Sequence, residues 1–270
     1  MTVAVKQESL FAGLFDDASA LLGATLQQAL EGRAARLGTP DASYVGSMLL
    51  PPSVVREALS EKGSLRITIV AGLHDDITQV LNLAETVSAH RRHELVGLHV
   101  PHSASWREAL NLLVPVVVRL PVGGAGLGML DELVGSGPMI RAGIRSSGPN
   151  AADNEELAAF VVGCAQRSIA FQLAGGLGGC VTGEAGRSGP GILNMLLATK
   201  LALRDRSVED VTAVLRQPEP ELVLSHVRAI TEDKVLQIRR IFRSVSYRDV
   251  RTAVGDLAAH ALISTAGQRV

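Results

Sequence analysis

Aromatic residues are scarce in this chain: they make up 3% of its 270 residues, although hydrophobic residues make up 47%. A large core must therefore be built from Ala, Val, Leu and Ile, which suits helices packed on a parallel sheet. At 270 residues the chain exceeds the usual domain size but fits a single α/β barrel.

Cysteine is scarce as well, and neither sign of charge is in excess. The two cysteines, Cys164 and Cys180, lack the spacing of a metal-ligand motif. Two thiols in so long a chain indicate a reducing compartment rather than a disulfide framework. The 26 basic residues are balanced by 27 acidic ones, so nothing indicates binding to nucleic acid or to an anionic membrane.

Long hydrophobic runs are missing too. The longest, residues 112–118, contains Pro115 and is too short to span a bilayer. Lys6, Glu8 and Asp16 stand where the apolar region of a signal peptide would lie. We therefore expect a cytoplasmic protein without membrane or nucleic-acid partners.

What the sequence does contain is an alternation of short apolar runs and amphipathic segments. The runs that end in turn residues predict strands at 44–50, 66–72, 95–100, 114–121, 139–143 and 169–175, with a late strand at 238–245. Helical periodicity predicts helices at 77–91, 191–204, 208–216 and 248–264. Six or seven β-α repeats predict an α/β fold, a TIM-like (β/α) barrel, irregular in places.

Two segments do not follow the repeat. Residues 1–40 are predicted to form a helical N-terminal extension, because leucines recur at helical spacing between Leu10 and Leu30. Residues 205–236 are expected to be helical and show no clear strand, which leaves open whether a seventh or eighth barrel strand lies there. The whole chain, 1–270, is expected to form one domain.

Three segments carry a family resemblance. Residues 11–18 read Phe-Ala-Gly-Leu-Phe-Asp-Asp-Ala, residues 139–144 read Met-Ile-Arg-Ala-Gly-Ile, and residues 171–179 read Phe-Gln-Leu-Ala-Gly-Gly-Leu-Gly-Gly. They resemble the Tyr-Ala-Gly-Leu-Phe-Pro-Pro-Ala, Lys-Ile-Arg-Thr-Gly-Gly and Phe-Lys-x-Thr-Ala-Gly-Leu-His-His motifs of a bacterial family of uncharacterised barrel-like proteins. The match runs nearly end to end and implies a barrel with a pocket near these motifs.

The departures from the family concern ionisable residues. The lysines and the His pair of these family motifs are replaced here. So are the His of a family motif His-Gly-Phe-Leu-Asn, which reads Pro-Gly-Ile-Leu-Asn at 190–194, and the Cys of a late motif Gly-Ser-Cys-Ser-Phe, which reads Arg-Ser-Val-Ser-Tyr at 243–247. Gly143 and Asn194 persist. Arg141 is the main charged residue that remains, and Arg119 stands where the family has Glu. The resemblance therefore implies a divergent member that has lost the ancestral chemistry.

Alternate residues of a strand share a face, so the carboxyl-terminal mouth of such a barrel is expected to gather Arg119, Arg141 and Gln172. We predict these three as the catalytic residues, with Arg141 anchoring an anionic or carbonyl group. The predicted substrate contacts are Met139, Ala174, Gly178, Asn194, His99 and Tyr247. Without Lys or a His cluster, neither a metal nor a cofactor is expected.

A pocket of this kind favours catalysis by positioning. The predicted function is a metal- and cofactor-independent enzyme of cyclase, isomerase or lyase type, acting on a largely apolar small molecule in specialised metabolism. The alternative is a non-catalytic pseudoenzyme that binds a metabolite or partners a catalytic relative. Self-association and pairing with such a relative both remain open.

Four other features have two interpretations each. Residues 124–128 hold three glycines after a strand and could bind a dinucleotide, but their spacing departs from that fingerprint and a loop that starts a helix is favoured. Residues 74–76, His-Asp-Asp, could form a metal or acid–base site, although capping of the next helix is favoured. Residues 186–189 could hold a phosphate or form a flexible lid. Cys180 could be a nucleophile, although a buried thiol is favoured.

Overall fold

Eight parallel strands close into a barrel in chain order in the computed structural model, which describes residues 8–264. The strands are β1 Phe15–Asp17, β2 Val45–Leu50, β3 Arg66–Val70, β4 Glu94–Pro101, β5 Val116–Arg119, β6 Ile140–Arg145, β7 Ala170–Ala174 and β8 Phe242–Tyr247. Pairing of β1 with β8 completes the ring, with Asp16 opposite Ser246. The closed ring confirms the predicted α/β barrel.

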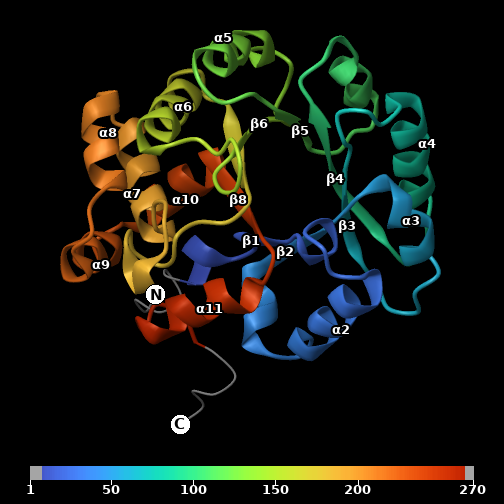
Figure 1. Ribbon diagram of the computed structural model, residues 1–270, viewed down its shortest axis with the longest axis horizontal. Coiled ribbons are helices and arrows are strands. Elements are labelled where there is room, and N and C mark those ends of the chain that lie inside the picture. The colour runs from blue at the N-terminus through green and yellow to red at the C-terminus, as the bar shows by residue number, and fades with distance from the viewer. Residues whose placement is uncertain (1–7, 265–270) are drawn as a thin grey trace.

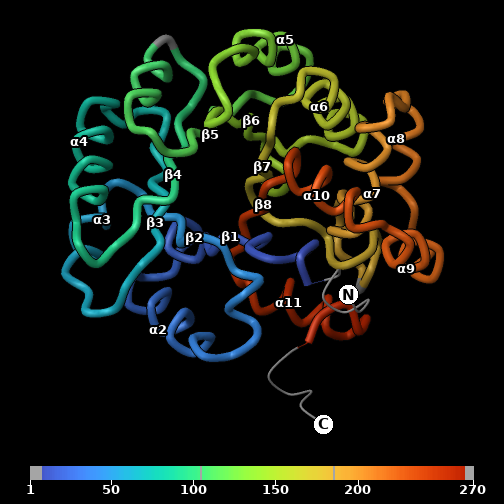
Figure 2. Tube along the Cα trace, turned by 180° about the vertical axis from the view of Figure 1, so that it is seen from behind, coloured from blue at the N-terminus to red at the C-terminus, as the bar shows by residue number. Residues whose placement is uncertain are grey.

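Helices surround this barrel on all sides (Figure 1). They are α2 Leu26–Arg36, α3 Pro52–Ala58, α4 Ile77–Ser88, α5 Gly124–Leu133, α6 Asn154–Gln166, α7 Ile192–Ala202, α8 Val208–Leu215, α9 Pro220–Arg228, α10 Glu232–Ile241 and α11 Val250–Ala259. Four 3-10 helices join them: η1 Ser19–Leu21, η2 Pro40–Tyr44, η3 Ala104–Asn111 and η4 Glu184–Gly186. Figures 1 and 2 both place α8 and α9 outside α7, away from the strands. Within residues 8–264, no helix has the length and hydropathy needed to cross a membrane.

Six of the predicted strands are confirmed with small changes at their ends, but the prediction for residues 1–40 is wrong in part. Within that segment the chain forms β1 as well as helix, and residues 1–7 lie outside the described part. A three-residue strand containing two aspartates has no period-2 apolar pattern that could identify it. The late strand was also misplaced, since residues 238–241 end α10 and β8 begins at Phe242.

Polar residues at the predicted boundaries start several helices. The Asp76 side chain accepts a hydrogen bond from the Thr78 N–H at 2.9 Å at the start of α4. At α6 the Asp153 and Glu156 side chains form a capping box, in which each accepts from the backbone N–H of the other residue. Residues 205–236 hold α8, α9 and the start of α10, so the eighth strand is β1 and none lies in that segment.

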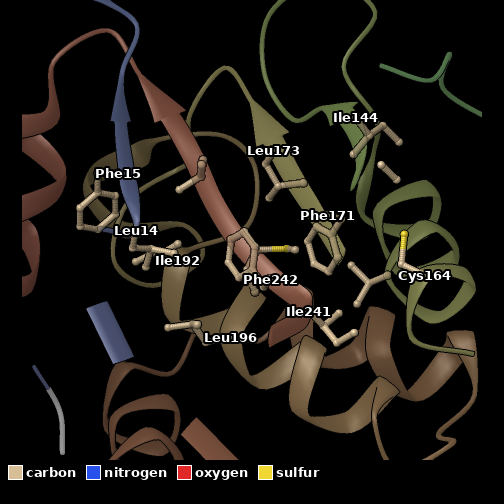
Figure 3. Close-up of a cluster of buried hydrophobic side chains, with 14 of the residues drawn as sticks. Leu14, Phe15, Ile144, Cys164, Phe171, Leu173, Ile192, Leu196, Ile241 and Phe242 are labelled. Atoms are coloured by element: carbon tan, nitrogen blue, oxygen red, sulfur yellow. The ribbon is translucent and has the colours of Figure 1, made fainter. Parts of the chain in front are cut away.

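The apolar core lies between the outer face of the barrel and the helices. Figure 3 shows Phe171 of β7 against Phe242 of β8, with side chains of α6, α7 and α10 around them. These two rings stack with centroids 5.0 Å apart, and Phe160 of α6 meets Phe171 edge to face at 5.6 Å. Burial of such a side chain contributes about 1.5–3 kcal/mol. Because strand residues alternate, the residues between these apolar ones face the barrel interior.

Candidate functional site

A polar cavity of about 330 Å³ lies inside the barrel and is lined by residues of all eight strands. One lining residue from each strand, in chain order, is Asp16, Ser47, Thr68, His99, Val117, Arg141, Gln172 and Ser244. Gly13, Pro115 and Arg239 also line it and precede β1, β5 and β8, so the cavity lies towards the amino-terminal ends of the strands. Barrels of this fold commonly fill their interior with branched apolar side chains. Here polar side chains take that place.

Two glycines make room for this polar interior. A Cβ on Gly46 would lie 2.5 Å from Asp16 Oδ1, and one on Gly97 would lie 2.9 Å from the Pro115 carbonyl oxygen. Any larger residue at position 46 would displace the carboxylate. The lack of a side chain at Gly46 of β2 therefore leaves the space that the Asp16 carboxyl group occupies.

Asp16 is the centre of a chain of hydrogen bonds that crosses the interior. Its Oδ1 accepts from the backbone N–H of Ser47 at 2.8 Å and from the Ser47 hydroxyl at 3.0 Å. Ser47 Oγ lies 2.8 Å from Thr68 Oγ1. On the other side, Ser244 Oγ donates to Asp16 Oδ2, and Gln172 Nε2 donates to Ser244 Oγ at 2.5 Å. Four strands besides β1 are thus linked through one carboxylate.

Besides its arginines, the cavity lining includes the titratable residues Asp16 and His99, and burial is the largest cause of the pKa shift of each. Burial raises the pKa of Asp16 above its ordinary value, although hydrogen bonds from Ser244 and Ser47 and the charge of Arg141 oppose the shift. Burial lowers the pKa of His99 to about 3, assisted by the nearby charges of Arg119 and Arg141. His99 is therefore neutral at physiological pH, and Asp16 is closer to neutrality than an exposed aspartate.

Four arginines line this cavity with Asp16, and three of them, Arg141, Arg239 and Arg243, are in no salt bridge among the described residues. Arg239 donates to the carbonyl oxygens of Phe242 at 3.0 Å and Ala12 at 3.1 Å. Burial and the charge of Arg243 lower the pKa values of Arg141 and Arg239 to about 10 each, so both stay protonated at neutral pH.

Within residues 8–264, Arg141, Arg239 and Arg243 form no salt bridge with a carboxylate. Arg66 also lines the cavity, but it pairs with Glu94 at 3.1 Å. Asp16 is the one carboxylate among the described residues of the lining, and these residues therefore carry an excess of positive charge.

The structure brings Arg141, Gln172 and His99 together but places Arg119 elsewhere. Arg141 is the second residue of β6, so it lies near the amino-terminal end, and the expectation that it joins a carboxyl-terminal mouth is wrong. Arg119 ends β5 at the opposite end, where it donates to the Ala71 carbonyl oxygen. The residue at which a strand begins decides which end of the barrel a given side chain lies near. The alternation of residues along a strand does not reveal where the strand begins.

The other predicted contact residues lie outside the cavity. Met139 precedes β6, is 46% exposed and lines a second hollow, which shares Arg141 and Arg243 with the cavity. Ala174 ends β7, and its carbonyl oxygen accepts from the Ser146 N–H at 2.9 Å. Gly178 lies in the loop after β7 and donates to the Pro190 carbonyl oxygen at 2.9 Å. Tyr247 ends β8 and meets Phe15 edge to face at 5.6 Å.

Asn194 is fully buried, and its amide is used entirely by the backbone. Its Oδ1 accepts from the Thr182 N–H at 3.0 Å. Its Nδ2 donates to the Val214 and Gln217 carbonyl oxygens at 2.9 and 2.8 Å. The side chain therefore joins the loop after β7 to the end of α8 and does not reach the cavity.

The features with two interpretations are resolved in part. Asp76 caps α4, and Asp75 accepts from the Gly72 N–H at 2.6 Å, which favours capping over a metal site. A Cβ on Gly126 would lie 1.9 Å from the Pro121 carbonyl oxygen, so that glycine permits close packing of α5. Arg187 in the segment 186–189 forms a two-bond salt bridge with Asp256.

Sequence reasoning missed Asp16, Ser244, Arg239 and Arg243. The available signal for Asp16 was the Asp-Asp pair directly after Leu14 and Phe15, which fits poorly with a helix packed on its apolar face. The two arginines carried no signal, because arginines near a helix C-terminus are ordinary on any surface helix.

No protein-family model and no curated relative matches the chain. One solved structure is similar: an F420-dependent secondary alcohol dehydrogenase in complex with an F420-acetone adduct. The likeness covers 92% of this chain and 98% of that one, at 10% sequence identity and a TM-score of 0.44. By this comparison the predicted cofactor-independent cyclase, isomerase or lyase is wrong, since the similar protein is a cofactor-dependent oxidoreductase. The identity and TM-score are too low to assign that protein's cofactor or activity to this chain.

Proposed function

We propose that this barrel binds a small polar molecule carrying a phosphate or carboxylate group, in the cavity at the amino-terminal half of the strands. The observation that carries the proposal is the set of three guanidiniums, those of Arg141, Arg239 and Arg243, around one cavity with a single carboxylate.

The electrostatics support an anionic ligand. Burial lowers the pKa of both Arg141 and Arg239, because their protonated forms lose solvation. The like charge of Arg243 repels both groups and lowers the same pKa values further. An oxyanion would relieve both effects, and guanidiniums suit phosphate and carboxylate groups because they can donate two parallel hydrogen bonds.

The rest of the lining suits a polar ligand body. Gln172 Oε1 is buried and has no hydrogen bond of good geometry among the described residues, although the Gln172 side chain lies close enough to His99 to oppose the lowering of its pKa. A buried acceptor of this kind is costly, and a ligand hydroxyl or N–H would satisfy it. Together with Ser47 and Thr68 it favours a hydroxylated molecule, and a cavity of about 330 Å³ accommodates a small one.

A second role, proton transfer by Asp16, is favoured by the raised pKa of its buried carboxyl. A carboxyl that changes protonation closer to neutral pH serves better as a general acid or base. Asp16 shares the cavity with the arginines, so an anion held by them would lie beside this group.

Calorimetric titration of the purified chain with inorganic phosphate, pyrophosphate and citrate tests the proposal. We expect saturable binding of at least one of these anions. Arg141→Gln should weaken it by about tenfold or more, the loss of a charge-assisted contact. Arg145→Gln is the matched control, since Arg145 is an exposed arginine on the same strand outside the cavity. Absence of binding to all three anions, or equal loss in both variants, would contradict the proposal.

A further inference from the structure

Three potential metal-binding side chains from distant parts of the sequence meet outside the arginine cavity. Cys180 lies in the loop between β7 and α7, Glu184 begins η4, and His260 follows α11. One ligand atom of each, the Cys sulfur, a carboxylate oxygen and a ring nitrogen, lies within 4.8 Å of the other two. The cysteine is buried, and the side chains of the glutamate and histidine are 29% and 19% exposed.

Glu184 holds this cluster together. Its Oε1 lies 2.8 Å from His260 Nε2, and its Oε2 accepts from the backbone N–H groups of Cys180 at 2.9 Å and Val181 at 3.1 Å. The carboxylate thereby fixes the loop beside the imidazole. Cys180 and Glu184 belong to the segment between β7 and α7, whereas His260 follows the last residue of α11.

We propose that Cys180, Glu184 and His260 form a binding site for Zn²⁺ or a similar transition-metal ion. A thiolate, an imidazole and a carboxylate are all ligands that Zn²⁺ accepts, whereas Mg²⁺ and Ca²⁺ prefer oxygen ligands alone. Thiolate and carboxylate together would also neutralise the two positive charges of the ion. Three protein ligands leave a fourth tetrahedral position for water or a small ligand.

Metal binding would require the three ligand atoms to move by about 1 Å. Bonds of about 2.0 to 2.3 Å to a tetrahedral Zn²⁺ place ligand atoms about 3.3 to 3.8 Å apart. The Glu184–His260 pair at 2.8 Å would have to open by about 0.5 Å, and separations of up to 4.8 Å would have to close by about 1 Å or more. Arg187 forms hydrogen bonds of 2.7 and 3.0 Å with Asp256 and so joins the same loop to α11. This salt bridge keeps the loop that carries Cys180 and Glu184 close to the helix that precedes His260.

The competing interpretation is a hydrogen bond between Glu184 and His260 beside an inert thiol. Burial raises the pKa of the Cys180 thiol, and the carboxylates of Glu184 and Asp256 raise it further. Without a cation the group therefore stays a thiol; a metal ion would favour the thiolate instead. Participation of the Cys180 sulfur is consequently the property that separates a metal site from a loop-capping hydrogen bond.

Titration of the chelator-treated full-length chain with Co²⁺ tests this directly. We expect one equivalent of Co²⁺ to produce a near-ultraviolet thiolate-to-cobalt charge-transfer band and visible bands of tetrahedral intensity. Addition of Zn²⁺ should abolish both. In Cys180→Ser the charge-transfer band should vanish. In Cys164→Ala it should persist, because Cys164 is the other buried cysteine and lies in α6, away from the cluster.

His260→Gln provides a second variant at a partly exposed position, in case a change at buried Cys180 prevents folding. It should weaken Co²⁺ binding by on the order of 100-fold, as expected when a metal ligand or its close support is lost. Circular dichroism checks that each variant is folded. No charge-transfer band in the native chain, the same band in folded Cys180→Ser, or native affinity in His260→Gln would overturn the proposal. Because neither readout depends on the anion cavity, failure there would leave this site unaffected, and the converse also holds.

Discussion

The Ser244 hydroxyl donates a hydrogen bond to Asp16 across the seam where the last strand of the barrel meets the first. β1 is only three residues long, so it contributes few backbone hydrogen bonds of its own. On its other side Asp16 accepts two hydrogen bonds from Ser47 of β2. Asp16 therefore shares the cavity with the arginines and also links β1 to both neighbouring strands. Substitution of Asp16 should affect both the stability of the barrel and the binding of a ligand.

Asp16→Asn should change how stability depends on pH. The folded pKa of Asp16 is raised above the ordinary 3.8, so between the two values the unfolded chain has already released this proton while the folded one retains it. The contribution of Asp16 to the free energy of unfolding is then greatest below pH 3.8 and falls as pH rises through the folded pKa.

Urea unfolding of both proteins across the acid to neutral range measures this dependence. The stability of the native chain relative to Asp16→Asn should decrease with rising pH, by at most about 1.4 kcal/mol per pH unit. A stability difference that is constant over the whole range would show that the buried carboxyl has an ordinary pKa.

His99→Gln should have the opposite dependence. The pKa of His99 is about 3 in the folded chain and 6.5 when exposed, so the unfolded state binds the extra proton as pH falls below 6.5. The native chain should therefore lose about 2 kcal/mol relative to His99→Gln between pH 6.5 and about pH 5. His226→Gln on α9 is the control for loss of an exposed histidine. If His99→Gln and the native chain lost stability in parallel, His99 would be titrating in the folded state.

The fold was largely predictable because a parallel strand buried on both sides leaves a run of β-branched residues, as in Val116–Arg119. β1 was not, since its pairing depends on partners more than 200 residues away in β8, which no local pattern encodes. The site was less predictable than the fold. Arg141 was predicted to be a catalytic residue at the carboxyl-terminal mouth, but β6 begins at Ile140, which puts Arg141 near the other end. Asn194 was predicted to contact the substrate, but its amide satisfies backbone groups. Polar residues with structural and with binding roles look alike until their partners are known.

Asn194→Ala should lower stability without changing anion affinity. The substitution leaves the Thr182 N–H and the Val214 and Gln217 carbonyl oxygens without their present partner. A buried unsatisfied group costs about 1 to 3 kcal/mol, so we expect a loss of about 3 kcal/mol in urea unfolding. Calorimetry with phosphate on the folded variant should give the native affinity. A stable variant with weakened binding would instead restore Asn194 to the ligand site.

Anion binding should also draw a proton onto the protein. An oxyanion held by Arg141 and Arg239 would lie in the same cavity as Asp16, and a nearby negative charge raises the pKa of a carboxyl. Where Asp16 is ionised in the free chain, binding should therefore be accompanied by proton uptake, at most one proton per anion. The observed binding enthalpy would then vary with the ionisation enthalpy of the buffer.

Titrating phosphate into the chain in two buffers of different ionisation enthalpy, over a range of pH, measures that uptake after correction for the protonation of phosphate itself. Asp16→Asn should abolish the protein's share while leaving the arginines to bind the anion. Arg145→Gln should keep it, because this exposed arginine lies outside the cavity. Uptake that persists in Asp16→Asn would assign the proton to another group and remove Asp16 from the proton-transfer role, since a carboxyl that does not respond to the bound anion cannot exchange a proton with it.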